Sequence, residues 1–174
     1  MLSGNPKAAL ALFDQGLAVE ATPELGFNHA LAELKVGDLT KAAAEFQSIY
    51  ADSASPFRAR AAYHGALALE TLGRAQEAEA WVERSLKLDP GDPDALAYIG
   101  LLRERRGDLQ AAGRAYQELL RWRPDLPFAM LRFGVAAMRA GRNETARSYF
   151  EKVVTTAPAS PEAVEARKYL VLWD

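Results

Sequence analysis

The sequence predicts an all-α fold of stacked helix pairs, and three observations lead to this fold class. Apolar residues recur at helical spacing through most of the 174 residues, and no stretch alternates apolar and polar residues as a half-buried strand does. Glycines that can end a helix return at a nearly constant interval, and prolines that can open one return at the same interval. With 49% hydrophobic and 25% charged residues, the composition is that of a folded globular protein.

The repeating unit is clearest in residues 92–124, where two predicted helices are separated by a Gly-Asp break. Asp92 is a suitable N-cap, and Pro93 has no backbone N–H to leave unsatisfied at the first helical position. Gly107 can adopt the left-handed conformation that ends a helix, and Pro124 cannot continue the second helix. The segment therefore predicts two antiparallel helices joined by a tight turn.

The same glycine and proline signals recur along nearly the whole chain. The break glycines are spaced by 33, 36, 34 and 34 residues; they are Gly4, Gly37, Gly73, Gly107 and Gly141. The prolines that open first helices are spaced by 33, 37, 34 and 34 residues; they are Pro23, Pro56, Pro93, Pro127 and Pro161. Because glycine and proline punctuate helices for different physical reasons, their shared period indicates an internal repeat.

With this period the chain resembles the tetratricopeptide repeat family, whose pattern is W-x2-L-G-x2-Y, A-x3-F and P over about 34 residues. The matching positions in the clearest unit are Leu96, Ile99, Gly100, Ala112, Tyr116 and Pro124. Arg103 departs from the pattern, since it stands where the family prefers Tyr. The resemblance implies an α-α superhelix, or solenoid, of helix-turn-helix units in which each pair completes the core of its neighbour.

We expect a single domain over residues 1–174. It would consist of a half repeat over 1–22, repeats over 23–55, 56–91, 92–125 and 126–159, and a C-terminal capping helix over 160–174. The second repeat carries a small insertion, and we expect its first helix to begin at Pro56 and to run about one turn longer than the others. The half repeat has two interpretations, a boundary within a longer protein or a natural capping helix.

Small residues recur at one position of each first helix and at one position of each second helix. They are Ala30, Ala66, Gly100 and Gly134, opposite Ala42, Ala78, Ala112 and Ala146. We expect them to allow close approach of the two helices, so that a bulky residue at Gly134 should destabilise the fold far more than one at Gly113.

In the family, first helices line a concave groove that binds extended peptides or partner helices. The resemblance implies this groove here, at Phe27, Leu31, Leu34, Lys35, Tyr63, Leu67, Ala97, Leu101, Arg105, Phe128, Leu131, Val135, Met138 and Arg139. Most of these residues are apolar, and a large exposed apolar patch normally marks an interaction site. The alternative for Phe128 and Leu131 is that the capping helix covers them.

Lys35, Arg105 and Arg139 occupy the same position in three repeats. They could form a basic ladder that receives a peptide with acidic residues or a free C-terminus. The alternative, which we favour, is that each cation complements the dipole of the helix end on which it lies. The clamp of Lys, Asn and Arg with which some family members hold carboxylates is not matched by the corresponding residues Phe27, Leu31, His64, Asp94 and Tyr98.

His29 takes a large apolar position of the first repeat, with Glu33 one turn further on. It has two interpretations, a packed histidine with one hydrogen-bonded nitrogen or half of a metal site. We favour the packed histidine, because the chain has only two His and no Cys, and we therefore expect neither metal nor cofactor.

Several function classes are disfavoured. The sequence has no Cys nucleophile, no Ser-His-Asp arrangement and no Gly-rich phosphate loop, so we expect no enzyme. Residues 101–147 hold ten Arg and five acidic residues, but the two are interleaved, which argues against a nucleic-acid surface. No apolar run approaches the about 18 residues of a membrane span. The absence of cysteine fits cytoplasm and periplasm equally.

These observations predict a non-catalytic scaffold or adaptor that holds a protein or peptide in the groove. Two alternatives stay open. The half repeat could dock onto a second copy and give a homo-oligomer, or the chain could be the regulatory arm of a larger enzyme.

Overall fold

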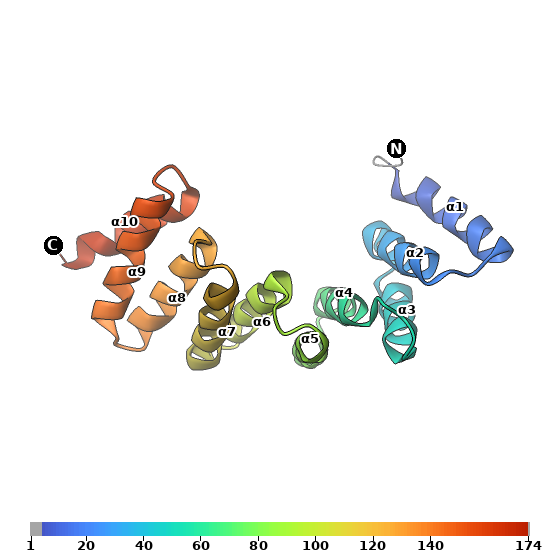
Figure 1. Ribbon diagram of the computed structural model, residues 1–174, viewed down its shortest axis with the longest axis horizontal. Helices are drawn as coiled ribbons and strands as arrows, with labels where there is room; N and C mark the ends of the chain where they lie inside the picture. The colour runs from blue at the N-terminus through green and yellow to red at the C-terminus, as the bar shows by residue number, and fades with distance from the viewer. Residues whose placement is uncertain (1–4, 174) are drawn as a thin grey trace. The chain divides into compact units, whose positions relative to one another are not determined.

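The computed structural model describes residues 5–173, and within that range every regular element is helical. The helices are α1 (Pro6–Val19), α2 (Pro23–Val36), α3 (Leu39–Ala51), α4 (Arg58–Thr71), α5 (Ala75–Leu88), α6 (Pro93–Arg105), α7 (Leu109–Trp122), α8 (Pro127–Arg139), α9 (Asn143–Thr156), α10 (Pro161–Leu170) and the 3-10 turn η1 (Val171–Trp173) (Figure 1). The all-α prediction is confirmed. None of these helices has the length and apolar character needed to cross a membrane.

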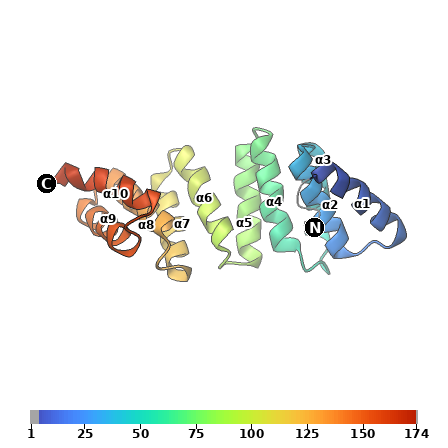
Figure 2. The same cartoon turned by 90° about the horizontal axis from the view of Figure 1, so that it is seen from above.

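The chain divides into two compact units, residues 1–90 and residues 91–174. In the first unit, α1 packs on α2, α2 on α3, α3 on α4 and α4 on α5. Figure 2 shows α4 and α5 lying side by side. In the second unit, α6 to α10 pack in the same successive way. Each unit therefore holds two helix-turn-helix pairs: α2 with α3 and α4 with α5, then α6 with α7 and α8 with α9. The assignment of all 174 residues to one domain stays a prediction.

The helix ends follow the chemistry of the sequence. Three first helices begin with a side-chain cap followed by proline: the side chains of Thr22, Asp92 and Ser160 accept hydrogen bonds from backbone N–H groups of the first turn. The break glycines of the second unit have positive φ angles, +86° at Gly107 and +74° at Gly141. Only glycine adopts this conformation without a steric penalty, so these two positions fix where the turns fall. Gly4 lies outside the described residues.

The insertion in the second repeat forms a loop and does not lengthen a helix. Asp52 and Ser55 each accept, through a side-chain oxygen, a hydrogen bond from the backbone N–H two residues further on. Such local bonds offer the backbone an alternative to the helix. α4 therefore begins only at Arg58 and has 14 residues, the same as α2. The expectation of a longer helix beginning at Pro56 is wrong.

The contact between the two helices of a pair is close because the first helix presents a small residue there. Gly100 lies against the ring of Tyr116, and a Cβ added to it would be 2.8 Å from Tyr116 Cζ. Gly134 lies in the same way against Phe150, whose Cε1 would be 2.7 Å from an added Cβ. The small residues that recur elsewhere at this contact are all fully buried: Ala30, Ala42, Ala66, Ala78, Ala112 and Ala146.

We expect Gly100→Ala and Gly134→Ala to lower the free energy of unfolding by about 1–3 kcal/mol each, because the added methyl group displaces a buried ring. Gly113→Ala is the matched control, since its added Cβ would meet nothing nearer than Ala136 Cβ at 3.6 Å. The better helix propensity of alanine should make that variant up to about 1 kcal/mol more stable. Urea denaturation followed by circular dichroism measures all three. Equal effects at the three sites would contradict the packing described here.

Candidate functional site

In the first unit, the predicted groove residues lie on α2 and α4, which contact one another. Leu31 and Leu34 of α2 are half-buried against the core of that unit, and Lys35 is exposed. Tyr63 and Leu67 of α4 are half-buried as well. These five residues keep part of their surface accessible on α2 and α4.

Phe27 is placed differently from the other α2 residues, because it is only 1% exposed. Its ring stacks on Phe57 with centroids 4.9 Å apart and meets the edge of Phe46 at 5.8 Å. The guanidinium of Arg60 lies 4.5 Å above the same ring, which adds a cation–π contact. Phe57 comes from the inserted loop, so the loop that replaced the expected longer helix also covers Phe27. Phe27 is therefore a core residue in this structure.

In the second unit, α6 contributes Ala97 and Leu101, and α8 contributes Phe128 and Met138; all four are half-buried. Leu131 and Val135 are each 3% exposed. They belong to one hydrophobic cluster with Ala163 and Ala166 of α10, which packs on α8. The alternative that the C-terminal helix covers this end is thus the one observed for Leu131 and Val135, whereas Phe128 keeps part of its surface accessible.

Several polar side chains of the second unit contact Glu104, a partly buried carboxylate. The Tyr116 hydroxyl donates a hydrogen bond to Glu104 Oε2 at 3.0 Å, and Arg132 Nη1 donates one to Oε1 at 3.4 Å. Arg139 Nη1 lies 3.9 Å from the same Oε1. Burial, together with the adjacent Glu104 charge, raises the pKa of Tyr116 well above its ordinary value. The hydroxyl therefore remains a protonated donor.

The cations of the predicted ladder are exposed, and each lies in the last turn of its helix: Lys35 on α2, Arg105 on α6 and Arg139 on α8. That position agrees with stabilisation by the helix dipole. In the second unit, sequence reasoning missed Arg132, which also reaches Glu104. Its spacing was a usable signal, since it precedes Arg139 by seven residues and so lies two turns earlier on the same helix face.

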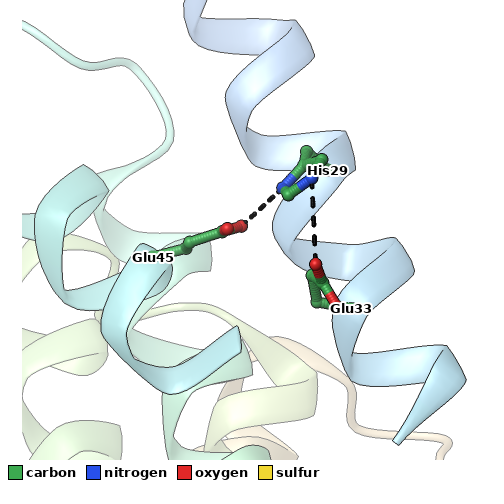
Figure 3. A group of neighbouring side chains, drawn as sticks. All are labelled: His29, Glu33 and Glu45. Atoms are coloured by element: carbon green, nitrogen blue, oxygen red, sulfur yellow. Dashed lines mark hydrogen bonds and ion pairs between the residues drawn. The ribbon is translucent and has the colours of Figure 1, made fainter. Parts of the chain in front are cut away.

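A second polar cluster surrounds His29 (Figure 3). Glu45 Oε2 lies 2.7 Å from His29 Nδ1, and Asp14 Oδ1 lies 3.1 Å from Nε2. Glu33 Oε1 is 3.8 Å from the same Nε2. The packed-histidine interpretation expected one hydrogen-bonded nitrogen, but here both ring nitrogens face carboxylates. Asp14 and Glu45 come from α1 and α3, and no spacing along the chain connects them with His29.

Successive helix pairs of similar length, joined by glycine turns, define a helical-repeat protein. The sequence profile of the tetratricopeptide repeat matches residues 27–93, 82–127 and 98–161. The chain therefore belongs to the tetratricopeptide repeat family. No curated protein matches it.

Several solved structures share this fold. MamA of Desulfovibrio magneticus RS-1, solved from residue 41 to its end, is 21% identical, with 91% of this chain and 89% of that chain covered and a TM-score of 0.74. PilF of Pseudomonas aeruginosa is 19% identical, with 94% and 74% covered and a TM-score of 0.78. YrrB, described as a repeat protein with an unusual peptide-binding site, is 18% identical, with 94% and 84% covered and a TM-score of 0.73. At these identities the likeness concerns the fold.

We expect Tyr116→Phe to reduce the alkaline sensitivity of folding. Because the Tyr116 pKa is raised in the folded state, the unfolded state loses this proton first. The contribution of the hydroxyl is complete below about pH 10, the ordinary tyrosine pKa, and is lost as the pH rises above it. Between about pH 9 and pH 11, the free energy of unfolding should fall more steeply for the wild type than for Tyr116→Phe. Tyr149→Phe is the control, and equal slopes for wild type and Tyr116→Phe would contradict the expectation.

Proposed function

We propose that this chain is a non-catalytic scaffold that binds a peptide or a helix of a partner protein on the inner faces of its first helices. The observation that carries the proposal is a row of half-buried apolar side chains on these faces, next to exposed cations. The accessible set is Leu31, Leu34, Lys35, Tyr63 and Leu67 in the first unit, and Ala97, Leu101, Arg105, Phe128, Met138 and Arg139 in the second.

Apolar burial supplies the affinity in this proposal. Each half-buried side chain still exposes apolar area, and covering it stabilises a complex by about 25 cal/mol per Å². The likeness to YrrB supports a peptide as ligand, because that protein is described as having a peptide-binding site.

Electrostatics favours an acidic partner for the second unit. Arg132 Nη1 and Arg139 Nη1 lie 3.4 and 3.9 Å from Glu104 Oε1, and the exposed Arg105 follows Glu104 on the same helix, so three arginines accompany this carboxylate. Charge complementarity of this kind accelerates association and orients the partner more than it adds affinity. The dipole role of Arg105 and Arg139 is compatible with this second role, because a cation at a helix end can contact a partner as well.

Self-association is a second candidate, favoured by large apolar residues exposed on the first and last helices. Leu12 and Val19 of α1 are 48% and 89% exposed, and Val164 of α10 is 52% exposed. A second copy could cover them. Light scattering over a range of concentrations tests this candidate, because a monomer at every concentration would exclude it. A regulatory role within a larger enzyme stays a prediction as well.

We expect Leu31→Glu and Leu101→Glu, combined in one variant, to abolish selection from a displayed peptide library, because a charge at each site opposes apolar burial. Leu88→Glu is the matched control, since this leucine is 43% exposed on α5, a second helix. Circular dichroism confirms that each variant is folded. Unchanged selection by the double variant would rule out the inner faces, and so would an equal loss in the control.

For peptides selected on the wild type, we expect the double variant Arg105→Glu/Arg139→Glu to bind acidic sequences about 10-fold more weakly at low salt. This difference in affinity should shrink at high salt. Arg121→Glu is the control, because this side chain is 71% exposed on α7. Fluorescence anisotropy measures the affinities. Affinities that do not respond to the double substitution would show that the two cations act only on their own helix ends.

A further inference from the structure

The cluster around His29 brings together ligand-type side chains from three helices of the first unit. Asp14 comes from α1, His29 and Glu33 from α2, and Glu45 from α3 (Figure 3 shows the last three). The His29 and Glu33 side chains are only 5% and 3% exposed. Glu45 is 27% exposed, whereas Asp14 is 59% exposed, so the cluster is closed on one side and reached from solvent on the other.

The two ring nitrogens of His29 have different surroundings. The 2.7 Å separation between Nδ1 and Glu45 Oε2 is that of a hydrogen bond in which Nδ1–H donates to the carboxylate. In a neutral imidazole this bond fixes the tautomer, and it leaves Nε2 with a lone pair. That lone pair faces oxygens of Asp14 and Glu33 at 3.1 and 3.8 Å. Either a proton on Nε2 or a bound cation would offset the repulsion between this lone pair and the two carboxylates.

A count of the charges in this cluster also favours a bound cation. The cluster holds the carboxylates of Asp14, Glu33 and Glu45; the Lys41 ammonium is bonded to Glu33 Oε1, and Lys7 of α1 lines the same hollow as Glu33 and Lys41. With a neutral imidazole and Lys41 as the bonded cation, the three carboxylates exceed it by two charges.

We propose that a divalent transition-metal ion of the zinc type binds between His29 Nε2 and the carboxylates of Asp14 and Glu33, while Glu45 orients the imidazole from its other nitrogen. Two ligand atoms about 2.1 Å from a tetrahedral ion are about 3.4 Å apart. The separations of Nε2 from the two carboxylates, 3.1 and 3.8 Å, lie on either side of that value. A carboxylate behind a ligating histidine is the usual partner of its second nitrogen.

The ligand set selects the class of ion. One imidazole with two carboxylates suits Zn²⁺ and related transition metals, whereas Ca²⁺ and Mg²⁺ prefer oxygen ligands alone. Lys41 competes with the ion, because its ammonium is bonded to the Glu33 oxygen that lies nearest Nε2. Removing that ammonium should therefore strengthen metal binding. This distinguishes the site from a purely structural ion-pair network, which would only lose a bond.

An ion at this position would connect α1 to the first repeat. In α1 only Ala9 is fully buried, whereas Leu10, Phe13 and Leu17 are half-buried. A shared ligand from Asp14 would fasten the middle of α1 to the middle of α2. Metal binding should then stabilise the half repeat, and this effect is independent of the inner faces proposed to bind a partner.

The test is isothermal titration of the chelator-treated protein with ZnCl₂, and with MgCl₂ in a parallel arm. We expect one Zn²⁺ site and no Mg²⁺ heat. Asp14→Asn removes an exposed ligand with little risk to folding, and it should weaken the Zn²⁺ affinity about 10-fold or more. Glu45→Gln should weaken it by a similar factor, because it changes the group that orients His29 through Nδ1. Lys41→Met should bind Zn²⁺ more tightly than the wild type. Glu77→Gln, at an exposed carboxylate on α5, should leave the affinity unchanged.

Amide hydrogen exchange gives the second measurement. Zn²⁺ should slow exchange in residues 6–19 of the wild type but not of Asp14→Asn, because only the wild type fastens α1 through the ion. No Zn²⁺ heat in the wild type would overturn the proposal and would leave a proton on Nε2 as the balancing charge. Equal Zn²⁺ affinity in wild type and Asp14→Asn, or unchanged exchange in α1, would overturn it as well.

Discussion

The close contact between the two helices of a pair is the constraint on which the rest of the structure depends. In the second unit, Gly100 and Gly134 let the rings of Tyr116 and Phe150 lie directly against helix backbone. This contact decides which face of each first helix turns inward to its partner. The accessible residues proposed to bind a partner flank that contact; Leu34 and Met138, for example, follow Ala30 and Gly134 by one turn.

Two acidic residues on first helices show how this family architecture accommodates buried charge. Glu104 is satisfied by a tyrosine hydroxyl and by arginines, and the surface around it carries net positive charge. Glu33 is bonded to Lys41, but Asp14 and Glu45 bring further negative charge close to it through His29. Burying a charge is costly unless an opposite charge balances it. The first arrangement is balanced by its own side chains, and in the second the three carboxylates share one bonded ammonium and the imidazole of His29.

The fold indicates the kind of role that the protein has, and it does not identify a partner. MamA and PilF share this arrangement of helix pairs at 21% and 19% identity, so the architecture persists while most side chains differ. Because function in such folds resides in the side chains grafted onto them, the partner that we propose would be selected by the accessible residues of the first helices. Here that set combines apolar anchors such as Leu101 with cations such as Arg139, and it is interrupted where the loop and α10 cover Phe27, Leu131 and Val135.

The sequence by itself determined the helix pairs, their period and the small residues at the contacts, because these depend on spacing along one chain and on the conformational limits of glycine and proline. Only the tertiary structure decided what covers each face. Phe27 is sealed by Phe57 from a loop 30 residues later, and Leu131 and Val135 by α10. The gathering of Asp14 and Glu45 on His29 was equally hidden, since helical periodicity reports which way a side chain points and not which neighbour it meets.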